Sequence, residues 1–212
     1  MPSEPHPRGR PQEGSGAAGH AGQARIDLRT LPAFASEGQR SINVVVETAR
    51  GSRNKFAYHP DSGLFLLKKV LPEGMAFPYD FGFVPSTLAD DGDPLDVLVL
   101  MDEPAFAGCL VTCRVVGVLI GDQAESRRPH EKRVRNDRIV AVAGASRTHE
   151  DIEDLRDLNG SMLDQVDAFF VHYHSTLGQR YRVLGRKGPR DAWKLVNEAA
   201  RKWGASEEKR GA

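Results

Sequence analysis

Residues 89–100 read ADDGDPLDVLVL, so three aspartates occur within six positions, immediately before an apolar run at 97–100. The aspartates are Asp91, Asp93 and Asp96, and a glycine and a proline stand between them. Residues two apart on extended backbone project to the same side, so Asp91 and Asp93 can face one centre. The glycine allows a bend and the proline fixes the exit, so Asp96 can return to that centre.

Three carboxylates held together raise one another's pKa unless a cation neutralises them. Their hard oxygen atoms suit Mg²⁺, Mn²⁺ or Ca²⁺ better than zinc. An EF-hand is excluded, because counting from Asp91 puts Leu95, Asp96 and Asp102 at its fifth, sixth and twelfth positions. A solvated turn explains DDGDP equally well, so partners elsewhere must decide between a turn and a metal site.

The segment from Ile42 to Val142 carries the signals of β-strands. Short β-branched or apolar runs are bounded by Pro and Gly clusters, and Asp61 to Gly63 has the composition of a hairpin turn. The predicted strands are INVVVET (42–48), KFAYHP (55–60), LFLLKKVL (64–71), DVLVL (96–100), CLVTCRVVGVLI (109–120) and RIVAVA (138–143).

The hydrophobic period changes after about Thr148, where apolar residues recur at steps of three and four. This pattern predicts a helix over 161–176, with Ser161 as N-cap and Asp164 as its capping-box partner. A second helix is expected to open near Pro189 and to turn Trp193, Val196 and Ala200 inward. Strands followed by segregated helices indicate an α+β domain, plausibly built on a small barrel.

Composition narrows the class of protein. Lys+Arg and Asp+Glu are equal at 29 each, which argues against a nucleic-acid-binding protein. No apolar run approaches the ~18 residues of a membrane span. Cys109 and Cys113 lie four residues apart on one predicted strand, too far for a disulfide, so we expect a cytoplasmic protein. Residues 1–25 and 205–212 are predicted to be disordered tails.

Four blocks in a fixed order carry a resemblance to a known family. They are VVVETARGSRNK from Val44, FPYDFGFVP from Phe77, DGDPLDV from Asp91 and FFVHYH from Phe169. Over about 42–185 the chain resembles the magnesium-dependent soluble inorganic pyrophosphatases, and DGDPLDV is the most specific block. The resemblance implies an OB-like five-stranded β-barrel with segregated C-terminal helices, forming one domain over 26–204.

The resemblance also implies roles for individual residues. Asp91, Asp93 and Asp96 would hold Mg²⁺, with Glu47 in or beside the metal shell. Asp93 would be the base for the attacking water, and Lys55 and Tyr173 would bind diphosphate oxygens. Further contacts to the substrate are expected from Lys69, Arg138 and His174.

Several positions depart from the family pattern. A family glutamate is Ala57 here, two tyrosines are Phe77 and Phe81, and a phosphate-binding arginine is Lys69, which lacks the bidentate fork. Where the family has a lysine after the tyrosine that matches Tyr173, this chain has His174, which either faces the phosphate or is solvated.

The family's D-x-K segment reads Asn136-Asp137-Arg138 here. In strict register the metal aspartate becomes Asn136, and Asp137 could replace it only after a shift of one residue. A further metal carboxylate would come from upstream, where the candidates are Asp122, Glu125 and Glu131.

We therefore expect an inorganic diphosphatase, a hydrolase that converts diphosphate to two orthophosphates with a divalent metal. An alternative is a catalytically weakened descendant that binds phosphate or nucleotide ligands. An oligonucleotide-binding barrel is disfavoured, because the aspartates would repel nucleic-acid phosphates. Diphosphate is the expected partner, without nucleic acid or membrane. A homo-oligomer is expected because the family's bacterial members are often oligomeric.

Overall fold

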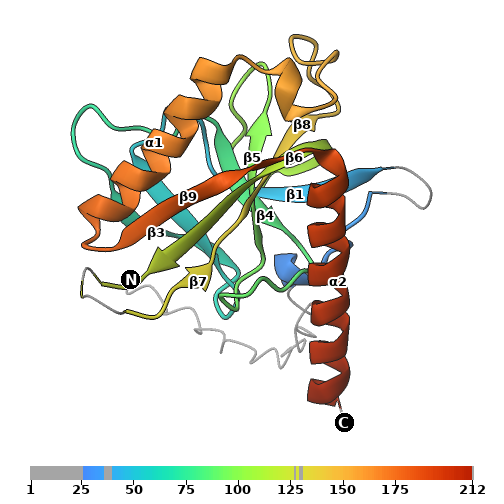
Figure 1. The fold of residues 1–212 in the computed structure, drawn as a ribbon. Coiled ribbons are helices and arrows are strands. Elements are labelled where there is room, and N and C mark those ends of the chain that lie inside the picture. Colours follow the sequence, from blue (N-terminus) through green and yellow to red (C-terminus); the bar gives the residue numbers. More distant parts are fainter. Residues whose placement is uncertain (1–25, 36–39, 127, 129–130, 212) are drawn as a thin grey trace, which may run out of the picture.

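The computed structural model describes residues 26–35, 40–126, 128 and 131–211 (Figure 1). The tail predicted over 1–25 lies outside the described residues. Nine strands, two α-helices and two short 3₁₀ helices, η1 (Leu28–Thr30) and η2 (Leu155–Asp157), make up this part of the chain. Among the described helices, none combines the length and the apolarity needed to cross a membrane.

Five strands close into a barrel. They are β1 (Ser41–Thr48), β4 (Asp80–Val84), β5 (Leu95–Leu100), β8 (Arg138–Ala143) and β6 (Leu110–Ala124). Neighbours pair in that order, and pairing between β1 and β6 closes the ring. The predicted five-stranded barrel is therefore confirmed.

The pairing of β5 with β8 is parallel and places two charged residues at one end of the barrel. Asp96 stands opposite Arg138 at the start of this ladder, and Val97 stands opposite Ile139. Because parallel strands begin at the same edge of a sheet, the two charged residues reach the same end of the barrel.

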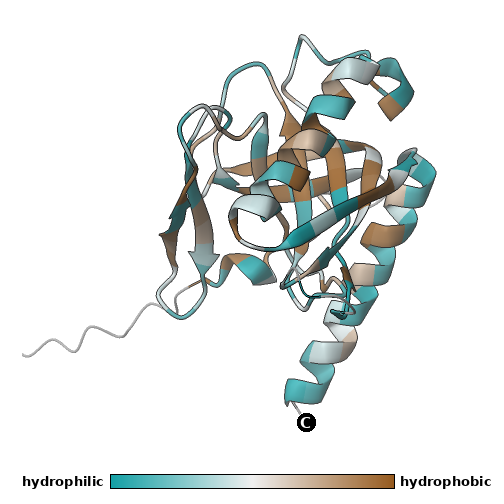
Figure 2. Ribbon diagram, turned by 60° about the vertical axis from the view of Figure 1, so that its left-hand side comes forward, coloured by the Kyte–Doolittle hydropathy of each residue, from teal (hydrophilic) through white to brown (hydrophobic). Residues whose placement is uncertain are grey.

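Both faces of β5 are buried, which explains the unbroken apolar run at 97–100. Val97 and Val99 belong to a cluster that includes Val196 of α2 (Pro189–Gly211). Leu98 and Leu100 belong to a second cluster with residues of α1 (Gly160–Thr176). The period-two alternation of a strand thus supplies two cores, each covered by one helix, and Figure 2 shows hydrophobic residues gathered on the barrel strands.

The predicted hairpin forms a separate two-stranded sheet beside the barrel. Strand β2 (Asn54–His59) pairs antiparallel with β3 (Leu64–Val70). Gly63 in the connecting turn has φ of 65°, a left-handed conformation that suits glycine. Lys55 stands opposite Lys69, so the hairpin presents two cations at one level.

Three expectations about the elements need correction. Helix α1 is capped by Asn159, whose side chain accepts a hydrogen bond from Ser161 N–H, so Ser161 is not the N-cap. Strands β4, β7 (Val134–Arg135) and β9 (Arg180–Lys187) were not predicted, and the last two pair with the far end of β6. Helix α2 continues to Gly211, through a segment for which a disordered tail is expected. Its last turns are held by an ion pair between Arg210 and Glu207.

Candidate active site

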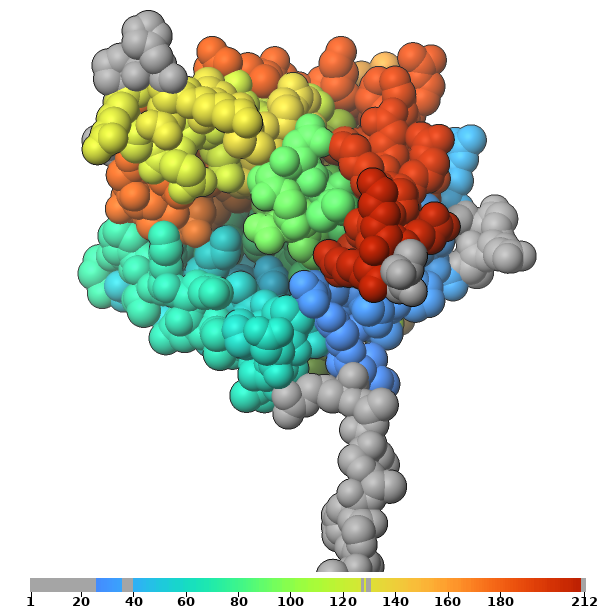
Figure 3. Space-filling model, turned by 90° about the horizontal axis from the view of Figure 1, so that it is seen from below, coloured from blue at the N-terminus to red at the C-terminus, as the bar shows by residue number. Residues whose placement is uncertain are grey.

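Two adjoining cavities open where the hairpin, the aspartate loop and both helices meet (Figure 3). One, of about 320 Å³, reaches α1, and we call it the α1 cavity. The other, of about 330 Å³, reaches the C-terminal turns of α2, and we call it the α2 cavity. The residues that line both are Lys55, Ala57, Lys68, Phe81, Asp93 and Asp96.

The loop between β4 and β5 carries the aspartates. The hydroxyl of Thr87 donates to the carbonyl of Val84 (2.6 Å) and accepts from Leu95 N–H (3.0 Å), which closes the base of the loop. At its tip, Gly92 has φ of 93°, and Asp93 N–H donates to the Asp91 carboxylate (3.3 Å). The glycine is therefore required by the backbone that brings these aspartates to one rim.

Helix α2 holds the same loop from outside. Leu88 N–H donates to the carbonyl of Ala199 (3.1 Å), and the Lys202 ammonium lies 2.6 Å from the Asp90 carboxylate. The helix thereby fixes the loop beside the α2 cavity, which Leu88 also lines.

Asp91, Asp93 and Asp96 all line the α1 cavity, together with Lys55. Loss of water, and then the charge of Asp96, raises the pKa of Asp91 to about 6. Burial also raises the pKa of Asp96, although the charges of Arg138 and Lys55 oppose the shift. The predicted aspartates are thus brought together as a group whose negative charge lacks sufficient compensation.

Glu47 lies beside them on β1 and lines the α2 cavity. Burial raises its pKa to about 7, and the negative charges of Asp96 and Asp93 add to the rise. Its carboxylate accepts a hydrogen bond from Tyr58 N–H (2.7 Å), which fixes its position against the hairpin.

The carboxylates do not form a ready-made ligand cage. Within the described part of the chain, no three Asp, Glu, His or Cys side chains lie close enough to hold a metal ion together. The donor chemistry nevertheless fits a hard divalent cation, because oxygen donors line one cavity and raise one another's pKa.

Cations occupy the hairpin side. The Lys55 ammonium lies 5.4 Å from the ring centres of both Phe81 and Tyr173. Loss of water, and then the charge of Lys55, lowers the pKa of Lys69. Phe81 therefore supplies an aromatic face to Lys55 at a position where the family pattern has a hydroxyl.

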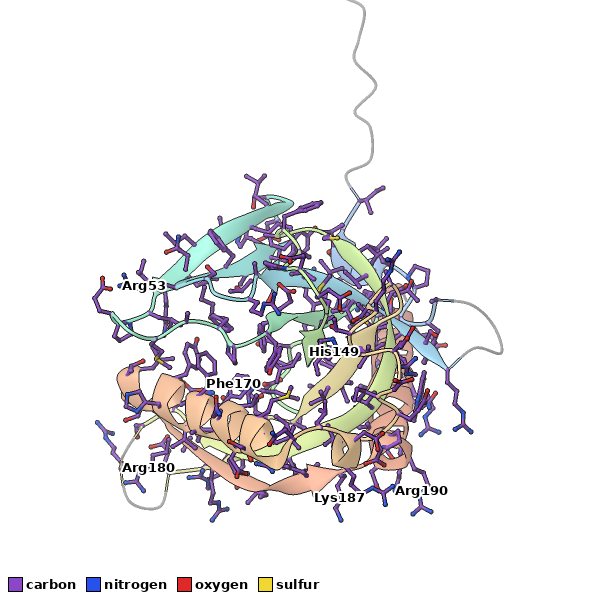
Figure 4. The ribbon with its side chains drawn as sticks, turned by 90° about the horizontal axis from the view of Figure 1, so that it is seen from above. Arg53, His149, Phe170, Arg180, Lys187 and Arg190 are labelled. Carbon is purple, nitrogen blue, oxygen red and sulfur yellow. The ribbon has the colours of Figure 1, made fainter. Side chains whose placement is uncertain are left out.

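Arg138 is buried in the opposite wall. Its guanidinium lies 3.9 Å from the centre of the Phe170 ring and 4.6 Å from that of Tyr181. Figure 4 shows Phe170 between α1 and the barrel strands. The Nε atom lies 3.8 Å from the Asp96 carboxylate and has no hydrogen-bond partner among the described residues. Arg138 thus combines two aromatic contacts with a cationic edge beside Asp96.

His174 is buried, so the solvated interpretation of this residue is wrong. Arginine can only donate, so His174 Nε2 accepts from Arg138 Nη2 (3.2 Å). The other ring nitrogen then donates to the Gln179 side chain (3.1 Å). Burial, and then the charge of Arg138, lowers the pKa of His174 to about 3. His174 therefore orients Arg138 as a neutral ring.

Asn136 and Asp137 point to different surroundings. Asn136 lines the α1 cavity and donates to the Gln123 side chain (2.8 Å). Asp137 accepts from Gly121 N–H (3.0 Å) and from Arg135 (2.9 Å), and it is not among the described residues that line either cavity. Strict register therefore places the amide, rather than the carboxylate, at the site.

The three upstream acidic candidates have partners of their own, and among the described residues only Glu125 of the three hydrogen-bonds to a residue that lines the α1 cavity. Asp122 pairs with Arg133 and Arg182, and Glu125 accepts from Gln179. Glu131 accepts from Ser126 (2.6 Å). None of the three is among the described residues that line the two cavities.

Sequence reasoning missed several residues of these walls. Gln123 and Gln179 line the α1 cavity, and Trp203 and Arg210 line the α2 cavity. The single available signal was the pair of Trp203 and Arg210 on one helical face, seven residues apart.

Comparison with known proteins identifies the family. A sequence model described as "Inorganic pyrophosphatase" matches residues 44–204. The chain belongs to the inorganic pyrophosphatase family. The family resemblance carried by the sequence blocks is thereby confirmed.

Individual relatives are similar in sequence to this chain over nearly their whole length. The inorganic pyrophosphatase of Synechocystis is 35% identical over 179 residues, covering 84% of this chain and 99% of the relative. That of Thermus thermophilus is 33% identical over 172 residues, covering 81% and 93%.

Solved structures of the family share the fold. The crystal structure of the Thermus thermophilus inorganic pyrophosphatase superposes with a TM-score of 0.76 at 30% identity, covering 84% of this chain and 99% of that one. The structure of the Helicobacter pylori enzyme gives a TM-score of 0.70 at 31% identity, covering 77% and 94%. Both agree with the closed barrel and its C-terminal helices.

Proposed function

We propose that this family member hydrolyses diphosphate to two orthophosphates in the α1 cavity, with Asp91, Asp93 and Asp96 as ligands for Mg²⁺. The observation that carries the proposal is the lining of that cavity, where these carboxylates face Lys55, Lys69, Arg138 and Tyr173. Acidic and cationic groups across one cavity suit a metal-bound polyanion, since the metal joins two sets of negative groups.

The cationic groups of the chain hold the substrate. Lys55 and Lys69 stand opposite each other on the hairpin and would bind phosphoryl oxygens from that side. Arg138 lines the opposite wall, where its positive charge would attract phosphoryl oxygens. Preorganised cations of this kind stabilise charge that develops on the leaving phosphate.

Asp93 would act as the base. A water oxygen forms a bond to one phosphorus, the bridging P–O bond breaks, and the bridging oxygen leaves with the other phosphate. The water proton goes to the Asp93 carboxylate, which lines both cavities and is exposed enough to meet a water molecule. A divalent cation on the carboxylates would polarise the phosphoryl oxygens and acidify the attacking water.

Asn136 and Glu47 would complete the metal surroundings. Asn136 offers a neutral amide oxygen to the α1 cavity, and Glu47 lies beside Asp93 and Asp96. Asp137 would join them only by leaving its contacts with Gly121 and Arg135. His174 would act on the substrate through Arg138.

The test is phosphate release from diphosphate in Mg²⁺, compared with Mn²⁺ and with a chelator. We expect turnover with Mg²⁺ and none after chelation. Absent release with retained diphosphate binding would contradict the proposal and favour a phosphate-binding descendant of the fold.

We also propose a cytoplasmic homo-oligomer that works without nucleic acid or membrane. Cys109 and Cys113 are free thiols, which suits a reducing compartment. Large apolar side chains are exposed on and near the hairpin, including Leu64, Val70 and Phe106, and such surfaces mark association. Light scattering of the purified protein would test the oligomer, and a mass equal to one chain would contradict it.

A further inference from the structure

The α2 cavity contains groups that diphosphate does not need. Trp203 and Arg210 reach it from the C-terminal turns of α2, and Arg29 reaches it from η1. The same cavity contains Lys55, Asp93 and Asp96, so these groups continue directly from the diphosphate site. An aromatic and cationic surface therefore extends the site beyond its phosphates.

We infer that a nucleoside diphosphate or triphosphate binds here and competes with diphosphate. Its terminal phosphates would occupy the proposed diphosphate site, and its base would lie on Trp203. The placement of the phosphates rests on the proposed function, whereas the placement of the base rests on the α2 cavity alone.

The charge distribution of the α2 cavity fits such a ligand. Arg29, Lys68 and Arg210 line it, whereas the ion-pair partners of the two arginines, Asp27 and Glu207, are not among its described lining residues. The acidic lining residues Glu47, Asp93 and Asp96 belong to the proposed metal side of the cavity. A polyphosphate chain thus passes from the metal side toward cations.

Trp203 supplies the surface for the base. Its ring is partly exposed and lies 5.9 Å from the guanidinium of Arg210, and Leu88 and Pro94 complete an apolar lining. Bases stack on exposed aromatic rings and arginine planes with little dependence on base identity. The ligand is therefore a class of nucleotides, with no selection for one base.

The size of the two cavities is compatible with a nucleotide. The α2 cavity measures about 330 Å³ and adjoins a second cavity of about 320 Å³. Pockets for small organic ligands begin at about 300 Å³. Ala57 lines both cavities, so one of the side chains where they meet is only a methyl group.

A matched pair of ligands tests the inference. Methylenediphosphonate and α,β-methylene-ADP carry the same non-hydrolysable phosphonate bridge, but the second also carries adenosine. We expect α,β-methylene-ADP to inhibit diphosphate hydrolysis competitively and to bind about tenfold more tightly than methylenediphosphonate, at fixed free Mg²⁺.

Tryptophan fluorescence locates the base. The chain has two tryptophans, Trp193 and Trp203, so Trp193→Phe leaves Trp203 as the sole reporter. We expect saturable quenching of this variant by α,β-methylene-ADP and none by methylenediphosphonate.

Variants of α2 supply the control. Trp203→Leu is expected to weaken α,β-methylene-ADP about tenfold, and Trp203→Phe to restore most of the affinity. Diphosphate turnover and methylenediphosphonate affinity should stay within about twofold in both variants, because the proposed base site lies outside the phosphate site. Arg201→Ala, on the same helix but outside the cavity lining, should behave as wild type.

Two outcomes would overturn the inference. One is equal affinity of the wild-type protein for the two ligands, and the other is unchanged α,β-methylene-ADP affinity in Trp203→Leu. Failure of the proposed function is a separate result, since it requires that diphosphate itself is not hydrolysed.

Discussion

The aspartate loop and the wall built by β8, β9 and α1 face the same cavity, but they compensate their charges differently. On the loop, Asp91 and Asp96 have raised pKa values because they lose water and because neighbouring aspartates repel their negative charge. On the wall, the Arg138 guanidinium lies between Phe170 and Tyr181 and donates to a neutral His174. The wall thus surrounds its buried guanidinium with aromatic faces, whereas the carboxylates of the loop would be compensated by the proposed divalent cation.

The largest loss of activity is expected when one negative charge is removed from the loop. We expect Asp93→Asn to lower Mg²⁺-dependent phosphate release by about a thousandfold, because the amide cannot accept the water proton. Steady-state phosphate release at saturating Mg²⁺ measures the loss. Asp90→Asn is the matched control, since Asp90 is on the same loop but pairs with Lys202. Near-normal turnover by Asp93→Asn would remove Asp93 from the mechanism.

A second change tests the opposite wall. Arg138→Met should lower the free energy of unfolding by about 3 kcal/mol, because it removes the buried hydrogen bond to His174 and leaves the part-buried carboxylate of Asp96 without its cation. Arg138→Lys keeps the charge but loses the planar stacking, so its loss should be intermediate. Urea unfolding in chelator measures both.

The control for this experiment is Arg135→Met. Arg135 is an exposed neighbour whose ion pair with Asp137 should contribute about 0–1 kcal/mol. Equal losses in Arg135→Met and Arg138→Met would show that burial between the two rings does not matter.

A divalent cation should stabilise the loop in a pH-dependent way. Glu47 has a pKa raised to about 7 and Asp91 one raised to about 6, so their contributions to stability are present in acid and are lost as pH rises through those values. Above pH 7 the cation replaces the protons. We expect Mg²⁺ at a hundred times its Kd to add about 2.7 kcal/mol at pH 8, and less at pH 5.5.

Thermal unfolding with and without Mg²⁺ at the two pH values measures this difference. Glu47→Gln should reduce the pH dependence, because one competing carboxylate is gone. An equal effect of Mg²⁺ at pH 5.5 and pH 8 would contradict the assignment of the loop as the cation site.

The contribution of the wall to stability should change with pH in the opposite sense, so that it is lost in acid. The pKa of His174 falls from 6.5 to about 3 on folding, so its contribution to stability is present above pH 6.5 and is lost as pH falls toward 3. The loss at pH 5 is about 2 kcal/mol. His174→Gln should flatten this part of the stability profile, measured by urea unfolding between pH 7 and pH 4. An unchanged slope would contradict a buried neutral ring.

The sequence was most informative where a strand or helix has a repeating pattern. The hairpin and the strands at 42–48, 96–100 and 138–143 follow from short β-branched or apolar runs between turns. Strand β4 was not predicted as a strand, although its residues belong to a family block, because its five residues are all buried and show no alternation. Strand β9 was missed because it is rich in arginine, and it is held by pairing with a β6 that is longer than expected.

The acidic half of the site could also be predicted, because its residues are close in sequence. The wall could not, since its geometry depends on side chains from three elements meeting around one guanidinium. His174 shows the difference: local sequence allowed a solvated ring, whereas packing against Tyr181 and Arg138 makes it buried and neutral. Arg210 reaches the α2 cavity only because α2 continues past residue 204, the end expected for the domain.

The parallel register of β5 and β8 has a consequence for biosynthesis. Asp96 and Arg138 are register partners but stand 42 residues apart in the chain. At about 5–20 residues per second, a ribosome would extrude Asp96 roughly 2–8 s before Arg138. During that interval the carboxylate has no cation from β8 and the barrel cannot close, so this end of the site cannot form before β8 has been translated.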